Sequence, residues 1–166
     1  MSTLLEKQIK VNRIVTTSIE HARAIEDPAR AKIMEILYRQ ALSADQISTA
    51  LKKTGYKKAL TTVRHHLEIL KESGLVEIVR IEESRGAITK YYSTSTKLLD
   101  FQTPVDFDST YSKVITNTST KIEKILKGLT PKTASKGKKS EDYSQYLVME
   151  IMNRAMTNVL EKSNKR

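Results

Sequence analysis

The sequence predicts a mainly α-helical fold that contains a small β-hairpin and has further helices on both sides of it. Apolar residues make up 39% of the 166 residues, which is enough for a core. Along most of the chain they recur at the spacing of amphipathic helices. The marked exception is residues 75–94, where two β-rich runs surround a turn that contains glycine. Together these patterns predict a group of helices, then a hairpin, then helices again.

The amino-terminal part is expected to form two helices separated by Asp27-Pro28. Residues 3–26 carry apolar side chains at helical spacing and are predicted as one helix. Asp is favoured just before a helix and Pro is tolerated at its first position. A second helix is therefore predicted from Pro28 to about Gln40.

Two further helices are expected between residues 43 and 73. Ser43 is a capping residue with Gln46 three positions later, which is the pattern of a capping box, and Thr54-Gly55 ends the helix that follows. The next helix covers residues 59–73 and stops at Gly74. Its predicted buried stripe is Leu60, Val63, Leu67 and Leu70.

The β-rich runs at 75–81 and 87–94 predict a hairpin whose turn contains Ser84, Arg85 and Gly86. Helices followed by such a hairpin are the element order of a winged helix-turn-helix domain. We expect this domain at residues 27–96, and we expect the amino-terminal helix at 1–26 to be a dimer contact.

Residues 97–166 are predicted to form a carboxy-terminal helical dimerisation region. Apolar stripes indicate helices over 109–127 and 141–162, and the Lys-rich segment 128–140 is expected to be a linker. The flanking helices offer more apolar surface than a domain of about 80 residues can cover, so a symmetric homodimer is expected. The Met-rich last helix fits core or dimer packing better than a hydrophobic ligand pocket.

Composition narrows the class of protein. The net charge of +10 favours polyanionic partners, and five basic residues with no acid between them lie between Asp45 and Glu68. The chain has no cysteine, so disulfides, thiolate metal sites and cysteine nucleophiles are excluded. No apolar run spans a membrane and no secretory signal is evident, so an intracellular, cytoplasmic and nucleoid-associated protein is expected. No enzyme signature is present.

The helix at 59–73 has the two faces that a helix in the DNA major groove needs. Its outward side carries short hydroxyl side chains and two potential donors. The expected contacts are Thr61, Thr62, Arg64 and His65. An ordinary solvated face is the alternative, and the surrounding order of elements favours DNA.

Other basic or capping residues are expected to contact the DNA backbone or minor groove. Lys57 and Lys58 precede the helix and suit phosphates, and the helix end capped by Ser43 would add another phosphate contact. Arg85 at the hairpin turn is expected to reach the minor groove, with Lys90 on the backbone.

These segments resemble the ArsR-type winged helix regulators. The family typically shows an Asp-Pro-x-Arg start, a recognition segment T-V-x-x-H-L-x-x-L-x-x-x-G-L-V and a wing ending in Tyr-Tyr. The corresponding residues here are Asp27, Pro28 and Arg30; Thr62, Val63, His66, Leu67, Leu70, Gly74, Leu75 and Val76; and Tyr91 and Tyr92. The match covers about residues 16–96, and the turn KKTGYKKAL and the wing RGAITKYY look like archaeal members.

The resemblance also raises the question of metal sensing, because founding members of the family use Cys thiolates or His/Asp clusters. This chain has no Cys and only three His, which are His21, His65 and His66. Neighbouring side chains on a helix diverge by about 100°, so His65 and His66 do not readily bind one metal. His66 matches the family's usual His and is expected to be packed and hydrogen-bonded. No metal site and no cofactor is expected.

The function predicted from the sequence is sequence-dependent binding of double-stranded DNA that regulates transcription. Repression by blocking a promoter is what the resemblance implies. Two alternatives stay open: a chromatin-type protein that coats DNA with low sequence specificity, and a protein-interaction winged helix within a larger assembly. The operator and any small-molecule effector are not encoded in a recognisable pattern.

Overall fold

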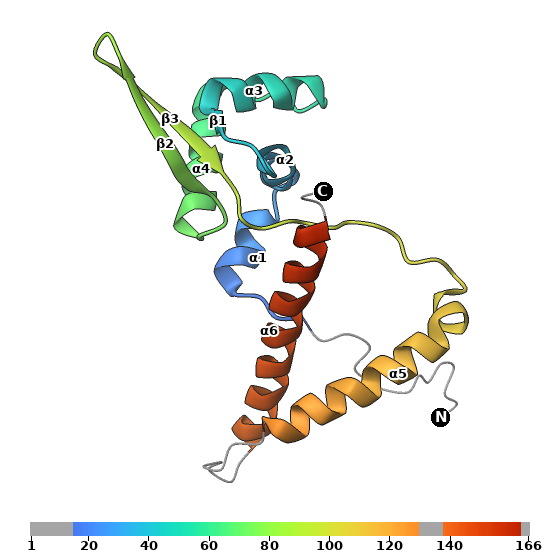
Figure 1. The fold of residues 1–166 in the computed structure, drawn as a ribbon. Coiled ribbons are helices and arrows are strands. Elements are labelled where there is room, and N and C mark those ends of the chain that lie inside the picture. The colour runs from blue at the N-terminus through green and yellow to red at the C-terminus, as the bar shows by residue number, and fades with distance from the viewer. Residues whose placement is uncertain (1–14, 130–137, 164–166) are drawn as a thin grey trace, which may run out of the picture. The chain divides into compact units, whose positions relative to one another are not determined.

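The computed structural model describes residues 15–129 and 138–163, and the chain divides into two compact units (Figure 1). One unit is Thr17–Phe101 and holds four helices and a three-stranded sheet. The other contains the two long helices that follow Gln102. The predicted domain limits at 1–26, 27–96 and 97–166 stay predictions.

Helix α1 is shorter than the sequence pattern predicts. It runs over Ile19–Ile25, and residues 15–18 are not helical, so the prediction of one helix through 3–26 is wrong at this point. Residues 1–14 lie outside the described part. The physical reason is a cap: the Ser18 hydroxyl accepts a hydrogen bond of 3.1 Å from the His21 amide. This bond satisfies one of the free amides with which a helix begins.

Helix α2 runs over Pro28–Leu37 and starts where the sequence predicts. The Asp27 carboxylate accepts from the Ala29 amide at 2.8 Å, and the Arg30 guanidinium donates to the carbonyls of Ala24 and Arg23 at the end of α1. Arg30 thus links α2 to α1, which gives the Arg of the Asp-Pro-x-Arg segment a structural role. The helix ends at Leu37 rather than near Gln40, because Tyr38 has an extended backbone with ψ of 120° and Arg39 takes a positive φ of 61°.

Helices α3, Ala44–Lys53, and α4, Leu60–Glu72, form the helix-turn-helix. Both hydrogen bonds of the predicted capping box at Ser43 and Gln46 are present, at 3.3 Å and 2.9 Å. Gly55 and Gly74 follow the two helices with φ of +91° and +76°. A residue with a β-carbon is strained at these angles, so both glycines end their helices as predicted.

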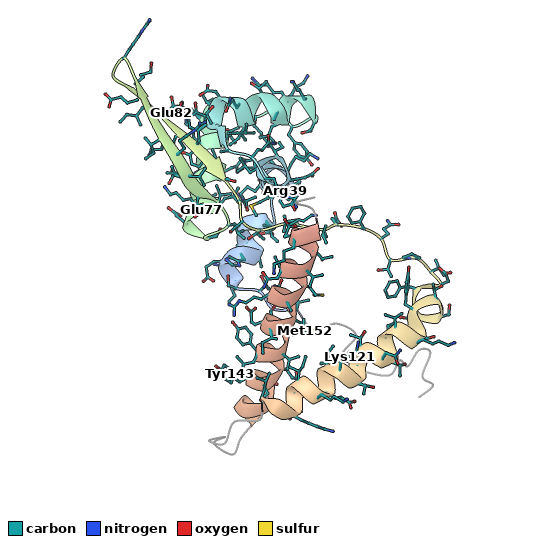
Figure 2. All side chains as sticks on the ribbon, viewed as in Figure 1. Arg39, Glu77, Glu82, Lys121, Tyr143 and Met152 are labelled. Atoms are coloured by element: carbon teal, nitrogen blue, oxygen red, sulfur yellow. The ribbon has the colours of Figure 1, made fainter. Side chains whose placement is uncertain are left out.

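The sheet has three strands in the order β1-β3-β2. Strands β2, Glu77–Ser84, and β3, Ala87–Ser93, form the predicted hairpin, and Figure 2 marks Glu77 and Glu82 along β2. Strand β1, Leu42–Ser43, pairs with Tyr91 and Tyr92 of β3 and was not predicted. A register shift at Val79 gives β2 one extra residue.

The core of this unit joins the apolar faces of all four helices to the base of the hairpin. The buried stripe predicted for α4 is confirmed, with Leu60 only partly buried. The buried side chains are Ala24, Ile33, Met34, Leu37, Ala44, Ile47, Leu51, Val63, Leu67, Leu70, Leu75, Val76 and Tyr92. The fold is a winged helix-turn-helix, mainly α with a small β-hairpin, as the sequence predicts.

The second unit consists of α5, Phe107–Gly128, and α6, Lys138–Ser163, which contact each other. Both predicted helices are confirmed, and both are longer than predicted. The expected linker 128–140 is wrong at its ends, since Gly128 belongs to α5 and the backbone is helical from Lys138. No residue of α5 is buried. Within the described residues, no helix has the length and apolar character needed to cross a membrane.

His66 is the conspicuous polar residue of the core. Its side chain is 5% exposed, and neither ring nitrogen has a hydrogen-bond partner among the described residues. The expectation of a packed side chain is confirmed, but the expected hydrogen bond is not formed. Burial lowers the pKa of the imidazole below its usual value, although the nearby Asp27 carboxylate opposes the shift. His66 therefore takes up a proton only at a lower pH than an ordinary histidine.

This burial predicts that the protein loses stability as the pH falls from 8 to 5. The unfolded chain takes up a proton near the ordinary His pKa of 6.5, whereas folded His66 does so only at lower pH. The stability contributed by neutral His66 is thus fully present above the unfolded-state pKa of 6.5 and decreases as the pH falls below it. The pKa of Asp27 lies below its usual value of 3.8, because burial raises it but the Ala29 amide and the charges of His66 and Arg30 lower it more. Protonation of Asp27 therefore adds a further loss of stability only at more acidic pH.

The measurement is urea unfolding at pH 8, 7, 6 and 5. His66→Met should flatten the profile over this range, whereas His65→Gln, at an exposed neighbour, should leave it unchanged. A profile that stays equally steep in His66→Met would show that another group controls the acid response.

Candidate nucleic-acid interface

Helix α4 is held by one face and leaves the opposite face in solvent. Val63, Leu67 and Leu70 are fully buried, while Thr61, Arg64 and His65 are exposed. These three exposed positions are spaced by three and four residues, so they form one stripe. Thr62, the fourth residue expected to contact bases, is half-buried at the edge of this stripe.

The amino end of α4 is open. Ala59 occupies the capping position, and no side chain there accepts a hydrogen bond from the first turn. Helices α1, α2 and α3, by contrast, are capped by Ser18, Asp27 and Ser43. Lys57 is exposed and Lys58 half-buried in the segment that leads into α4. Free amides and two ammonium groups thus lie at the same end of the helix.

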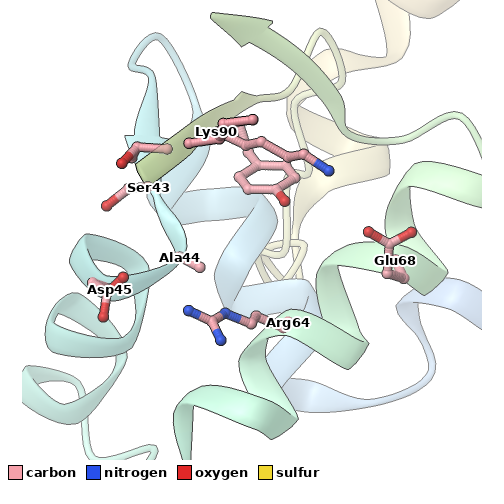
Figure 3. Close-up of a pocket in the computed structure, with 9 residues that line it drawn as sticks. Ser43, Ala44, Asp45, Arg64, Glu68 and Lys90 are labelled. Carbon is pink, nitrogen blue, oxygen red and sulfur yellow. The ribbon is translucent and has the colours of Figure 1, made fainter. Parts of the chain in front are cut away.

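A groove of about 300 Å³ lies between the start of α3, the middle of α4 and strand β3 (Figure 3). Arg64 of α4 and Lys90 of β3 border it from different elements, and Ser43 lines it at the start of α3. The fold therefore brings together Ser43, Arg64 and Lys90, which the sequence predicted as separate DNA contacts. Ser43 is 7% exposed, because its hydroxyl also caps α3.

Two carboxylates share this groove. Asp45 lies in the first turn of α3, and Glu68 lies one turn after Arg64 on α4. Glu68 forms an ion pair with Lys71, which removes part of its negative charge from the groove. A polyanion that enters the groove is attracted by Arg64 and Lys90 and repelled by Asp45. The groove is therefore not uniformly basic, and its charges favour an anionic strand near Arg64 and Lys90.

The hairpin projects Arg85 at its tip. Ser84 pairs with Ala87, so Arg85 and Gly86 form a two-residue turn with φ of 51° and 79°. Positive φ at both central positions is the mark of a type I′ turn, in which Asn or Gly is the usual first residue. Arg85 is exposed to solvent and does not line the groove between α3, α4 and β3. It is a cation held at an unfavourable backbone angle.

The face of the hairpin opposite Lys90 carries three polar side chains that contact one another. The Arg80 guanidinium lies 3.9 Å from the centre of the Tyr91 ring and 3.2 Å from the Glu82 carboxylate. The Tyr91 hydroxyl donates to Glu82 at 2.8 Å. Since these groups satisfy one another, Arg80 is not an additional free cation of the wing.

Six residues that line the groove were not among the contacts expected from the sequence. They are Ala44, Asp45, Glu68, Ile88, Thr89 and Tyr92. The strand period of two contained the signal for Ile88: Tyr92 is buried, so Lys90 and Ile88 must lie on the same face of β3 and turn toward α4. For the two acids no sequence signal distinguished a groove position from an ordinary surface.

Within the described residues, no group of three or more His, Cys, Asp or Glu side chains is placed to hold a metal ion. The two imidazoles on α4 point to different surroundings, with His65 exposed and His66 buried. His21, on α1, is half-buried. The site therefore offers cations, hydroxyls and one exposed imidazole, which are groups that recognise an anionic polymer.

Comparison with known proteins gives a match to one family model and a similarity to a solved structure. Residues 25–79 match the model of a helix-turn-helix domain family. No curated protein matches the sequence significantly. Among solved structures, the chain is similar to the homodimeric winged helix-turn-helix DNA-binding domain, fragment 1–100, of Mb0332 from Mycobacterium bovis, a possible ArsR-family transcriptional regulator. The identity is 22%, the coverage 64% of this chain and 91% of that one, and the TM-score 0.37.

The turn geometry predicts that Arg85 is kept at a cost in stability. Arg85→Asn should stabilise the protein by about 0.5–1 kcal/mol, because Asn adopts positive φ more readily than Arg. Thermal unfolding measures the effect. Arg85→Gln removes the same charge without this backbone preference and should give no comparable gain. Equal stability of the Asn and Gln variants would contradict the assignment of strain to this residue.

Proposed function

We propose that this protein binds double-stranded DNA in a sequence-dependent manner and regulates transcription, with α4 in the major groove. The observation that carries the proposal is the stripe of Thr61, Arg64 and His65 beside a groove that also contains Lys90. The helix-turn-helix family match over residues 25–79 supports it. The role is that of a non-enzymatic regulator without a cofactor.

Different residues of this surface take different roles. Thr61, Thr62 and His65 read base edges, since short or planar polar side chains near the start of the helix approach them closely. Lys57, Lys58 and the uncapped amides of α4 bind phosphates, which position the helix without specifying a sequence. Arg64 and Lys90 hold the DNA strand between helix and wing. Ser43 supports this strand from the start of α3.

The wing extends the contact into the neighbouring minor groove. Arg85 is a long cation on the solvent-exposed tip, and a narrow A·T-rich minor groove attracts such a side chain. The strain at its backbone fits this role, because natural proteins keep unfavourable angles mainly at positions that act. Binding is therefore strongest where an A·T-rich segment flanks the bases that α4 reads.

The protein acts as a homodimer. Helix α5 has no buried residue, and its exposed apolar side chains recur along one side. They include Phe107, Tyr111, Val114, Ile115 and Leu126. Helix α6 adds Tyr143, Tyr146, Met156, Val159 and Leu160, and Figure 2 marks Tyr143 and Met152 on it. A helix with an uncovered apolar stripe gains stability when a second copy covers it. A twofold dimer then reads an inverted repeat.

Repression is the proposed direction of regulation, and occupation of a promoter is its simplest mechanism. The motif resemblance to archaeal ArsR-type regulators supports this assignment. Release from DNA then depends on protein concentration, on salt or on an effector other than a thiophilic metal, because the chain has no cysteine.

Substitutions at base and phosphate positions should separate the two kinds of contact. His65→Ala should change which sequences are preferred and cost about 1–3 kcal/mol at the base it contacts. Joint replacement of Lys57 and Lys58 by Gln should weaken all duplexes alike and reduce the slope of log K against log salt by up to about 0.9 for each phosphate that the variant no longer neutralises. Selection of sites from random duplexes, followed by titration at several salt concentrations, measures both effects.

Three other results would change the assignment. General coverage without preferred sites would indicate a chromatin-type protein. Absence of binding to any duplex would favour a protein-interaction winged helix. Unchanged preference in every α4 variant would remove this helix from the major groove.

The dimer predicts a sharp difference between two faces of α5. Val114→Glu places a charge in the apolar stripe and should convert the dimer to monomer. Thr120→Glu adds the same charge on the opposite side of the helix and should not. Sedimentation equilibrium measures the effect, and the inverted repeat should lose affinity only with Val114→Glu. A dimer equally tight in both variants would place the interface elsewhere.

A further inference from the structure

The face of the wing that turns toward α4 carries two exposed isoleucines beside Lys90 and Glu83. Ile81 and Ile88 are 61% and 67% exposed. Ile81 pairs with Lys90 and Ile88 with Glu83 across the hairpin, so both isoleucines lie on the Lys90 side of the ribbon. Ile88 itself lines the groove beside Arg64.

No structural need of the described unit accounts for these two side chains. The core reaches only the base of the hairpin, where Tyr92 and Ile78 pack, and Ile81 and Ile88 lie farther along toward the tip. Thr would serve a strand equally well at an exposed position. Two neighbouring exposed isoleucines therefore indicate a surface that another molecule covers.

The charges beside the isoleucines indicate which molecule this is. Arg64 and Lys90 border the same groove and attract phosphates, and of the two carboxylates in that groove Glu68 is paired with Lys71. Between its phosphates a DNA strand presents the C–H surfaces of its deoxyribose rings. Such a strand alternates anionic and apolar groups, which matches a wing surface where Lys90 lies beside Ile81 and Ile88 and where Arg64 borders the same groove as Ile88.

We propose that Ile81 and Ile88 pack on deoxyribose rings of the DNA strand that passes between α4 and the wing, with Arg64 and Lys90 on its phosphates. This inference rests on the proposed function and adds a contribution that ionic screening does not remove. Part of the affinity then comes from apolar burial and persists at high salt, whereas the part from Arg64 and Lys90 falls with salt.

The test compares salt dependence in matched variants with a duplex that the wild-type protein binds. Ile88→Thr and Ile81→Thr, which both keep a β-branched residue in the strand, should each lower the affinity about three- to tenfold at every salt concentration. The slope of log K against log salt should not change. Lys90→Gln should instead reduce that slope by about 0.9.

Two controls complete the design. Val79→Thr changes an exposed residue at the register shift of the same hairpin, outside the pairs Ile81–Lys90 and Glu83–Ile88, and its affinity should equal that of the wild type. Ile88→Val removes one methylene and should lie between wild type and Ile88→Thr. Equal unfolding temperatures would show that all variants keep the fold.

The outcomes distinguish this inference from the function beneath it. If the wild-type protein binds DNA and the isoleucine variants bind equally well, the apolar contact is wrong and the proposed function stands. If the isoleucine variants lose dimerisation rather than DNA affinity, the patch is an interface between two copies and the inference is wrong. If the wild-type protein binds no duplex, both fail.

Discussion

Val63, Leu67 and Leu70 of α4 are fully buried against the apolar faces of α2 and α3, and this packing sets the direction of every other side chain on the helix. Truncating one such leucine to alanine typically costs about 2–5 kcal/mol, whereas an exposed ion pair such as Glu68–Lys71 contributes less than about 1 kcal/mol. The orientation of Thr61, Arg64 and His65 is therefore a consequence of the core. Their own interactions are too weak to determine it.

The junction of α1, α2 and α4 shows how polar groups assist this packing. Asp27 caps α2, Arg30 binds the last carbonyls of α1, and His66 of α4 is buried within electrostatic reach of both. Buried backbone groups at helix ends need partners, and Arg30 supplies them for α1. Burial of the His66 ring disfavours its charged form, so the same junction that orders the domain also makes it sensitive to acid.

Much of the fold was predictable because its signals are local. Ser43 with Gln46, Asp27 with Pro28, and Gly55 and Gly74 are caps and stops whose geometry depends on a few neighbouring residues. Strand β1 was not predictable, because two residues have no period and their pairing with β3 is tertiary. The start of α1 was missed because apolar spacing continues through Val15 although Ser18 begins the helix. For the site, residue types and elements were predictable, whereas the groove that joins Ser43, Arg64 and Lys90 required the packing of three elements.

The placement of α4 in the major groove is tested most directly by methylation interference on a selected DNA site. Guanine N7 faces the major groove, so methylation there blocks a helix that reads base edges but leaves the phosphates unchanged. The proposed arrangement predicts interference at guanines within each half-site, with no effect at those outside it. Equal binding to duplexes methylated at N7 throughout the site would contradict it.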